Sequence, residues 1–171
     1  MGPLPEWIDS LVDRLMQYEI WQTRPDQLIV NEYQPGQGIS SHIDRIESFE
    51  DGIVSISLGS DCVMNFTRAL DKLPTSINEV KEANSASTTP STTPSTTPST
   101  ASPPTAVTSN ATVDAVDVLL QRGSAVCLLK ESRYLWRHGI VARKTDQYKG
   151  RKIHRQRRVS LTFRKVKLSS S

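Results

Sequence analysis

The sequence predicts a mainly β domain, arranged as an antiparallel sandwich or barrel. Short segments with alternating apolar and polar residues recur at near-regular spacing, and turns that contain glycine separate them. A segment close to the N-terminus has instead the residue spacing of an amphipathic helix. The chain has 171 residues, of which 36% are hydrophobic, so it is long enough for one compact domain with a core.

The helix is expected over residues 5–16, with Pro5 where a helix often begins. Its apolar residues recur at helical spacing: Trp7, Ile8, Leu11, Val12 and Leu15. We expect this helix to pack under a sheet and assign it no chemistry.

The strands are predicted from alternation. Residues 28–33 form the first, and residues 53–58 and 62–66 alternate in the same way. The turn-forming Gly59-Ser60-Asp61 joins the second and third runs and favours a β-hairpin. We expect further strands at residues 113–120, 125–129, 135–141 and 159–166.

A low-complexity stretch interrupts this pattern. Residues 83–112 are almost all Ser, Thr, Pro and Ala, and Ser-Thr-Thr-Pro occurs three times in tandem, ending at Pro90, Pro94 and Pro98. Such a composition cannot bury enough apolar surface to offset the entropy lost on ordering. We expect a disordered insertion within a single domain that spans residues 1–171. A linker between two domains is the less favoured alternative, because the candidate ligands lie on both sides of it.

Basic residues concentrate in the C-terminal part, although the net charge of the chain is only +3. Asp146 is the only acidic residue between positions 133 and 167, against Arg133, Arg137, Arg143, Lys144, Lys149, Arg151, Lys152, Arg155, Arg157, Arg158, Arg164, Lys165 and Lys167. Residues 149–158, which include His154, are expected to form a basic surface loop. A local field of this kind suits a polyanion such as nucleic acid, and a solvated loop without a partner is an equal alternative.

Cys62 and Cys127 each lie within an apolar, strand-like run, where buried free thiols are favoured over a disulfide. The sequence contains no N-terminal signal segment and no run of about 20 apolar residues. We therefore expect a soluble monomer without membrane contact, located in the cytoplasm, the nucleus or both.

A candidate metal site begins with His42-Ile43-Asp44. On an extended chain, side chains two residues apart lie on the same face, so both can reach one metal ion. His138 would complete the set from a distant strand. Two imidazoles and one carboxylate form the facial triad typical of a non-haem Fe(II) centre, which leaves positions open for an organic acid and dioxygen. The alternative is that His42 is a loop residue and His138 a packed core histidine.

The C-terminal strand suggests what the organic acid would bind. Arg158 and Arg164 share the polar face of this strand, and a buried cation without an anionic partner is costly. A dicarboxylate would supply charge for both, because a guanidinium matches a carboxylate in bidentate geometry. Asn31 and Tyr33 share a face of the first strand and could hydrogen-bond the same acid. An edge strand with arginines in water is the alternative.

These residues resemble the AlkB family of iron- and 2-oxoglutarate-dependent dioxygenases. The shared pattern is Asn-x-Tyr at 31–33, His-x-Asp at 42–44, the distal His138 and Arg-x5-Arg at 158–164. Two more specific stretches are Glu-Ser-Arg-Tyr-Leu-Trp-Arg-His-Gly-Ile at 131–140 and Ser-Leu-Thr-Phe-Arg-Lys-Val at 160–166. The similarity is greatest to the oxygenase domain of homologues that hydroxylate a modified wobble uridine in tRNA.

The resemblance implies a double-stranded β-helix, or jelly roll, in which His42, Asp44 and His138 bind Fe(II). In this family an N-terminal segment ahead of the helix covers the substrate base. We expect this chain, which begins shortly before the helix, to be N-terminally truncated and to lack that segment.

The resemblance also implies how 2-oxoglutarate would bind. Arg158 would pair with its distal carboxylate, and Arg164 would lie near its metal-side carboxylate or near Asp44. Asn31 and Tyr33 would hydrogen-bond the co-substrate.

The implied activity is oxidative demethylation or hydroxylation of alkylated or modified bases in RNA, especially tRNA, or in DNA, with dioxygen as the second co-substrate. The alternatives are the same chemistry on a protein or lipid, and a binding module without turnover.

Overall fold

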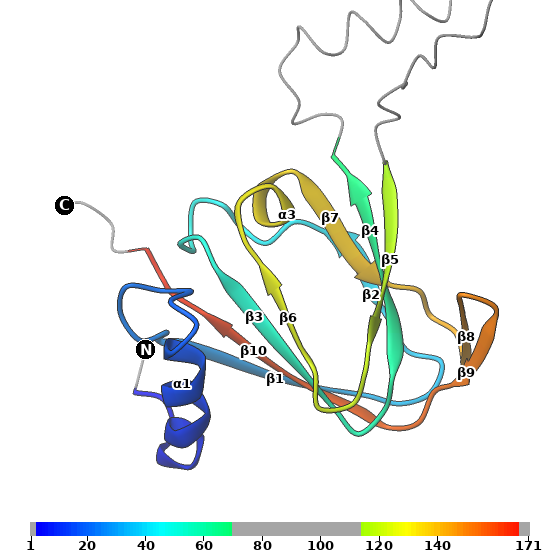
Figure 1. The fold of residues 1–171 in the computed structure, drawn as a ribbon, viewed down its shortest axis with the longest axis horizontal. Helices are drawn as coiled ribbons and strands as arrows, with labels where there is room; N and C mark the ends of the chain where they lie inside the picture. Colours follow the sequence, from blue (N-terminus) through cyan, green and yellow to red (C-terminus); the bar gives the residue numbers. More distant parts are fainter. Residues whose placement is uncertain (1–2, 70–113, 168–171) are drawn as a thin grey trace, which may run out of the picture. The chain divides into compact units, whose positions relative to one another are not determined.

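The computed structural model describes residues 3–69 and 114–167. The predicted insertion at residues 83–112 lies outside these described residues, so its disorder stays a prediction. The described chain is built around two four-stranded antiparallel sheets and a two-stranded ribbon (Figure 1). The expected double-stranded β-helix, with a helix at its N-terminal end, is therefore confirmed.

In the described residues, the helical elements are η1 (Glu6–Ile8), α1 (Asp9–Met16) and α3 (Lys130–Tyr134). The strands are β1 (Gln27–Tyr33), β2 (Ile39–His42), β3 (Ile53–Leu58), β4 (Cys62–Arg68), β5 (Ala115–Leu120), β6 (Ala125–Leu128), β7 (Trp136–Ile140), β8 (Thr145–Tyr148), β9 (Arg151–His154) and β10 (Arg158–Arg164). One sheet has the order β1-β10-β3-β6 and the other β2-β7-β4-β5, while β8 and β9 form the ribbon.

The alternation of β10 gives the first sheet two chemically different faces. Leu161 and Phe163 point to the outer face, where they are buried in one apolar cluster with residues of α1. Arg158 and Arg164 point the other way and line a cavity between the sheets. Because successive side chains of a strand face opposite sides, one short segment both anchors the helix and supplies the charges of the cavity.

The helix buries a narrower face than the sequence predicts. Ile8, Val12 and Leu15 are buried against the first sheet, whereas 65% of Trp7 is exposed. The prediction that Trp7 belongs to the apolar face was wrong. The buried face follows the i, i+4, i+7 spacing of Ile8, Val12 and Leu15, and Trp7 lies outside this spacing.

The predicted hairpin of residues 53–66 is also wrong. β3 and β4 lie in different sheets: β3 pairs with β10 and β6, and β4 pairs with β5 and β7. Gly59 between them has a φ of +83°, and a Cβ there would meet the carbonyl oxygen of Arg157 at 2.5 Å. Residues 59–61 therefore do form the predicted turn, but this turn connects one sheet to the other instead of joining two paired strands.

The ribbon replaces most of the expected basic loop. Lys149 and Gly150 join its strands, and both have positive φ angles, of 48° and 77°. Positive φ at both central residues is the geometry of a two-residue type I′ hairpin turn. The helix α3, just before β7, is a further element that alternation did not predict.

The two cysteines belong to different apolar regions. Cys62 is buried in the core between the sheets, and Cys127 is a half-buried free thiol packed against the outer cluster. Within residues 3–69 and 114–167, no helix is long and apolar enough to cross a bilayer.

Candidate metal and co-substrate site

The candidate residues meet in one cavity between the two sheets. Its lining includes every residue that the sequence singles out: Asn31, Tyr33, His42, Asp44, His138, Arg158 and Arg164. A larger hollow of about 420 Å³ is lined by β2 and β7, with Asn65 and Thr67 of β4, but no ionisable side chain lines it. Charged and imidazole groups converge only in the first of these two spaces, so we place the candidate site there.

The metal-ligand candidates come together where the end of β2 lies beside the middle of β7. His42 faces His138 directly in the β2–β7 ladder, with ring centroids 4.5 Å apart, and Asp44 follows His42 by two residues. One ligand atom from each of the three side chains lies within 4.8 Å of the others. The Oδ2 atom of Asp44 is 3.5 Å from Nε2 of His138. Two nitrogens and one oxygen in this arrangement fit the donor set of Fe(II).

The hydrogen bond of His42 prepares its other nitrogen for a metal. Nδ1 lies 2.8 Å from the carbonyl oxygen of Ser40. A carbonyl can only accept, so Nδ1 carries the proton and Nε2 is left as a lone-pair donor. Such a bond to the second ring nitrogen is the usual way in which proteins orient a metal-binding histidine.

Electrostatics keep His138 neutral. Burial disfavours the imidazolium and, together with the nearby His42, lowers the pKa of His138 to about 4, although Asp44 acts in the opposite direction. A metal ligand must be the unprotonated imidazole. His138 is therefore in its ligand form at neutral pH without having to lose a proton.

Asp44 is held by Arg164. The Nη2 atom of Arg164 lies 2.6 Å from Oδ1 of Asp44, which leaves Oδ2 facing His138. The Arg164 guanidinium also lies 4.9 Å from the ring centroid of Phe49. Of the two positions that the resemblance allows for Arg164, the structure shows the one beside Asp44.

Arg158 lies at the other end of β10 in a different environment. It is only 5% exposed, its Nε donates to Oγ of Ser57 at 2.8 Å, and its guanidinium lies 5.5 Å from the ring centroid of Tyr33. No carboxylate of the described residues forms an ion pair with it. A buried guanidinium of this kind has the charge and geometry to receive a carboxylate, so Arg158 is a candidate for binding one.

Asn31 and Tyr33 lie beside this arginine. In the β1–β10 ladder, Tyr33 is paired with Arg158 and Asn31 with Ser160. Both line the cavity, so they are placed to hydrogen-bond an acid that Arg158 holds.

Arg133 is a residue of the site that the sequence did not indicate. It comes from α3 and is 1% exposed. Its Nη1 donates to the carbonyl oxygen of Asp44 at 2.9 Å, and its Nη2 to that of Arg45 at 3.1 Å. Its sequence neighbourhood gave no clear signal of burial, because the polar residues Lys130, Glu131 and Ser132 directly precede it.

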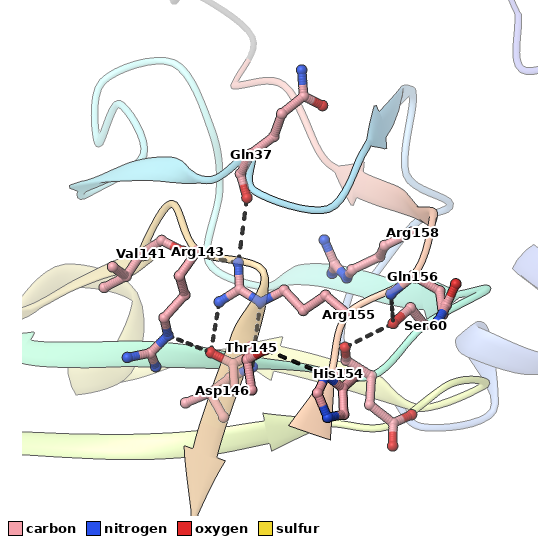
Figure 2. Close-up of polar contacts among 12 residues, drawn as sticks. Gln37, Ser60, Val141, Arg143, Thr145, Asp146, His154, Arg155, Gln156 and Arg158 are labelled. Carbon is pink, nitrogen blue, oxygen red and sulfur yellow. Dashed lines mark hydrogen bonds and ion pairs between the residues drawn. The ribbon is translucent and has the colours of Figure 1, made fainter. Parts of the chain in front are cut away.

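Close to the Arg158 end lies a second set of buried charges, the ribbon cluster of Arg143, Asp146 and Arg155 (Figure 2). Asp146 is fully buried, and its oxygens accept bonds from Nε and Nη2 of Arg155, both at 2.7 Å, and from Nε of Arg143 at 2.6 Å. The backbone N–H of Val63 adds a bond of 3.0 Å. Burial acts to raise the pKa of Asp146, but these hydrogen bonds outweigh it and lower the pKa.

Arg155 also donates through Nη1 to the carbonyl oxygens of Val141 and Gln37, at 2.8 and 3.3 Å. It thereby ties the ribbon to the end of β7 and to the turn before β2 (Figure 2). His154, in β9, is exposed, and its Nδ1 lies 3.4 Å from Oγ1 of Thr145. Its predicted surface position is therefore correct, although it lies on a strand.

Comparisons with known proteins bear on this geometry. A family model described as the 2OG-Fe(II) oxygenase superfamily matches residues 1–164. The chain is 35% identical over 182 residues to the tRNA (carboxymethyluridine(34)-5-O)-methyltransferase ALKBH8 of Mus musculus, covering 97% of this chain and 21% of that protein. It is 29% identical over 163 residues to the uncharacterized protein L905 of Acanthamoeba polyphaga mimivirus, covering 95% of this chain and 59% of the viral protein.

Among solved structures, OsALKBH1 superposes with a TM-score of 0.54 at 19% identity, covering 95% of this chain and 66% of that one. At this identity the likeness supports the fold alone. The family match extends over nearly the whole chain and includes both histidines, the aspartate and the two arginines of the cavity. The chain therefore belongs to the 2OG-Fe(II) oxygenase superfamily and, within it, to the AlkB family.

Proposed function

We propose that this chain catalyses the Fe(II)- and 2-oxoglutarate-dependent oxidation of a modified base in RNA, with tRNA as the preferred class. The observation that carries the proposal is the pairing of two features in one cavity. A His-Asp-His group lies at one end of β10, and at the other a buried guanidinium, Arg158, has no carboxylate partner in the described chain.

The protein's part in metal binding follows from the contacts. His42 and His138 would each supply a neutral nitrogen, and Asp44 would supply Oδ2, because Arg164 holds Oδ1. These three residues would hold the ion, and 2-oxoglutarate and dioxygen would bind beside them. Ferrous iron held there would supply the activation of dioxygen that is coupled to decarboxylation of 2-oxoglutarate to succinate.

The protein's part in co-substrate binding centres on charge. Three guanidinium groups, those of Arg133, Arg158 and Arg164, lie at or beside the cavity, against the single carboxylate of Asp44. This excess of positive charge favours a dianion. Arg158 would pair with the distal carboxylate, oriented by Ser57, while Tyr33 and Asn31 would offer neutral hydrogen bonds.

Exposed lysine and arginine side chains of the ribbon that have no carboxylate partner among the described residues support a nucleic-acid substrate. In the ribbon cluster, Arg143 and Arg155 are occupied by Asp146, so they do not contribute to a docking surface. Lys144, Lys149, Arg151 and Lys152 are exposed on or next to the ribbon, and none forms an ion pair with a described carboxylate. These four side chains suit a phosphate backbone. The mouse relative ALKBH8 is, by its name, an enzyme that acts on tRNA.

Succinate release from 2-oxoglutarate tests the proposal. With Fe(II) and ascorbate, we expect turnover that rises with modified tRNA more than with unmodified tRNA, methylated DNA or a peptide set. Asp44→Ala should abolish turnover, because it removes a ligand. A chain that releases no succinate under any of these conditions is a binding module, and stimulation by peptides alone would identify a protein oxygenase.

The salt dependence of RNA binding separates the substrate classes further. Replacing Lys149, Arg151 and Lys152 together by serine should lower the slope of log K against log salt by about 2, since each phosphate contact on a single strand contributes about 0.7. The triple variant should keep its basal succinate release.

A further inference from the structure

Arg133 is a buried cation that the fold does not neutralise. It is 1% exposed, and no carboxylate of the described residues forms an ion pair with it. Its Nη atoms donate to two carbonyl oxygens, its guanidinium carbon lies 5.1 Å from the ring centroid of Tyr134, and its Nε has no hydrogen-bond partner among the described atoms. Burying a charge on such terms is unfavourable, and an apolar residue of similar volume often serves stability as well or better. Stability alone does not explain an arginine at this position.

The carbonyl groups that Arg133 holds belong to the metal-ligand segment. Asp44 and Arg45 come after β2 has ended, so no sheet ladder fixes their backbone. The planar fork of an arginine holds two consecutive carbonyls in a fixed geometry, whereas a lysine ammonium donates from a single, freely rotating group. The contact joins residues that are 89 positions apart in the chain.

The helix that carries Arg133 is itself anchored. The carboxylate of Asp51, a few residues beyond Arg45, accepts the backbone N–H of Lys130 at 3.0 Å, at the first residue of α3. At the other end of α3, the carbonyl oxygen of Leu135 accepts the N–H of Ala69 at 2.8 Å. Because α3 is held by hydrogen bonds at both ends, it can keep Arg133, and through Arg133 the backbone of Asp44, in a fixed position.

We propose that Arg133 is a positioning residue that fixes the Asp44 carboxylate for metal binding. Arg133 holds the backbone of Asp44 while Arg164 holds Oδ1 of its side chain, so Oδ2 stays aimed at the space beside His138. The inference rests on the proposed function, because it concerns the same metal site.

Metal affinity tests the proposal in the chain of residues 1–171. We would titrate Arg133→Met and Arg133→Lys with Co²⁺ alone, following heat release and the visible absorption of the bound ion. Loss of a residue that orients a metal ligand typically weakens affinity 10- to 100-fold. We expect at least a tenfold loss for methionine and a smaller loss for lysine, together with an altered Co²⁺ spectrum.

Two matched variants separate positioning from general loosening. Arg155→Lys alters another buried arginine that donates to backbone carbonyls, but at the ribbon. Lys167→Met removes a tether on the same loop, the 2.8 Å bond from Nζ to the carbonyl oxygen of Ile46. Both should bind Co²⁺ within about twofold of the unaltered protein, even where they lower its melting temperature.

The outcomes distinguish this inference from the proposed function. If the unaltered chain does not bind Co²⁺, the metal site itself is wrong. If it binds Co²⁺ and Arg133→Met binds equally well, or if the two control variants lose as much affinity as Arg133→Met, the positioning role is overturned while the oxygenase proposal stands.

A measurement on the unaltered protein remains decisive if the Arg133 variants do not fold. The guanidinium protons of Arg133, assigned through their contacts with the Tyr134 ring, should exchange slowly with water and shift when Zn²⁺ is added. Guanidinium signals that exchange fast, or that do not respond to Zn²⁺, contradict the proposal.

Discussion

The ribbon cluster and the cavity between the sheets both have buried arginines, but they differ in whether each arginine has a carboxylate partner. In the ribbon cluster, Arg155 forms a buried ion pair with Asp146, which also accepts a bond from the less buried Arg143. In and beside the cavity, Arg133 binds only carbonyl groups, and Arg158 has a hydroxyl and an aromatic ring for neighbours. Removing one member of a buried ion pair leaves the other charge uncompensated, whereas a buried cation without a carboxylate partner is a candidate for binding an anionic ligand.

The largest effect on stability is expected at the buried ion pair between Asp146 and Arg155. Asp146→Asn keeps the shape of the side chain but removes the charge that compensates Arg155. Breaking one half of a buried pair costs roughly 3–5 kcal/mol, because the other half stays buried and unpaired. We expect the free energy of unfolding in urea to fall by about this amount, with Co²⁺ affinity within about twofold of the unaltered value. A loss below about 1 kcal/mol would show that the ribbon cluster does not stabilise the fold.

The pH dependence of stability should separate the two regions. The pKa of His138 falls from 6.5 to about 4 on folding. Between these values the unfolded chain binds a proton at this histidine that the folded chain does not, so stability is full above pH 6.5 and is lost as the pH falls toward 4. A shift of this size is worth on the order of 3 kcal/mol. Asp146, whose lowered pKa starts from 3.8, adds its loss only at still lower pH.

Urea unfolding of the metal-free protein between pH 7.5 and 4 measures this slope. His138→Gln removes the titrating group and should flatten the curve in that window, while leaving the loss at lower pH in place. An equal slope in the variant would assign the effect to other groups.

Local alternation in the sequence was enough to assign faces to the strands. The residues of β10 alternate between apolar and polar along the whole strand, so the polar face and its two arginines follow from the period alone. The spacing of His42 and Asp44 placed them on one side for the same reason, and the structure brings both beside His138.

Alternation does not identify partners. The sequence of a strand such as β3 has the same alternation whether the next strand pairs with it or lies in another sheet. The hairpin prediction failed for this reason. Asp146 and Arg133 were missed for a related reason. Each is a polar residue whose burial depends on contacts with distant segments, Val63 in one case and Asp44 in the other, and no local period records such a contact.

The smallest effect on stability, combined with a large effect on binding, is expected at Arg158. Arg158→Met keeps most of the side-chain volume and removes a buried charge that no described carboxylate balances. The free energy of unfolding should therefore change by less than about 1 kcal/mol or rise, in contrast to Asp146→Asn. Binding of 2-oxoglutarate to the Zn²⁺-loaded protein should weaken by about 10- to 100-fold, since hydrogen bonds to a charged group contribute roughly 1.5–3 kcal/mol.

Calorimetry of 2-oxoglutarate binding and urea unfolding of the same Arg158→Met sample give both quantities. A strong loss of stability with unchanged co-substrate affinity would make Arg158 a structural residue like Arg155. The cavity would then have no arginine assigned to the distal carboxylate of 2-oxoglutarate. That result would also remove the proposed difference between the ribbon cluster, where Asp146 pairs with Arg155, and the cavity, where a ligand would pair with Arg158.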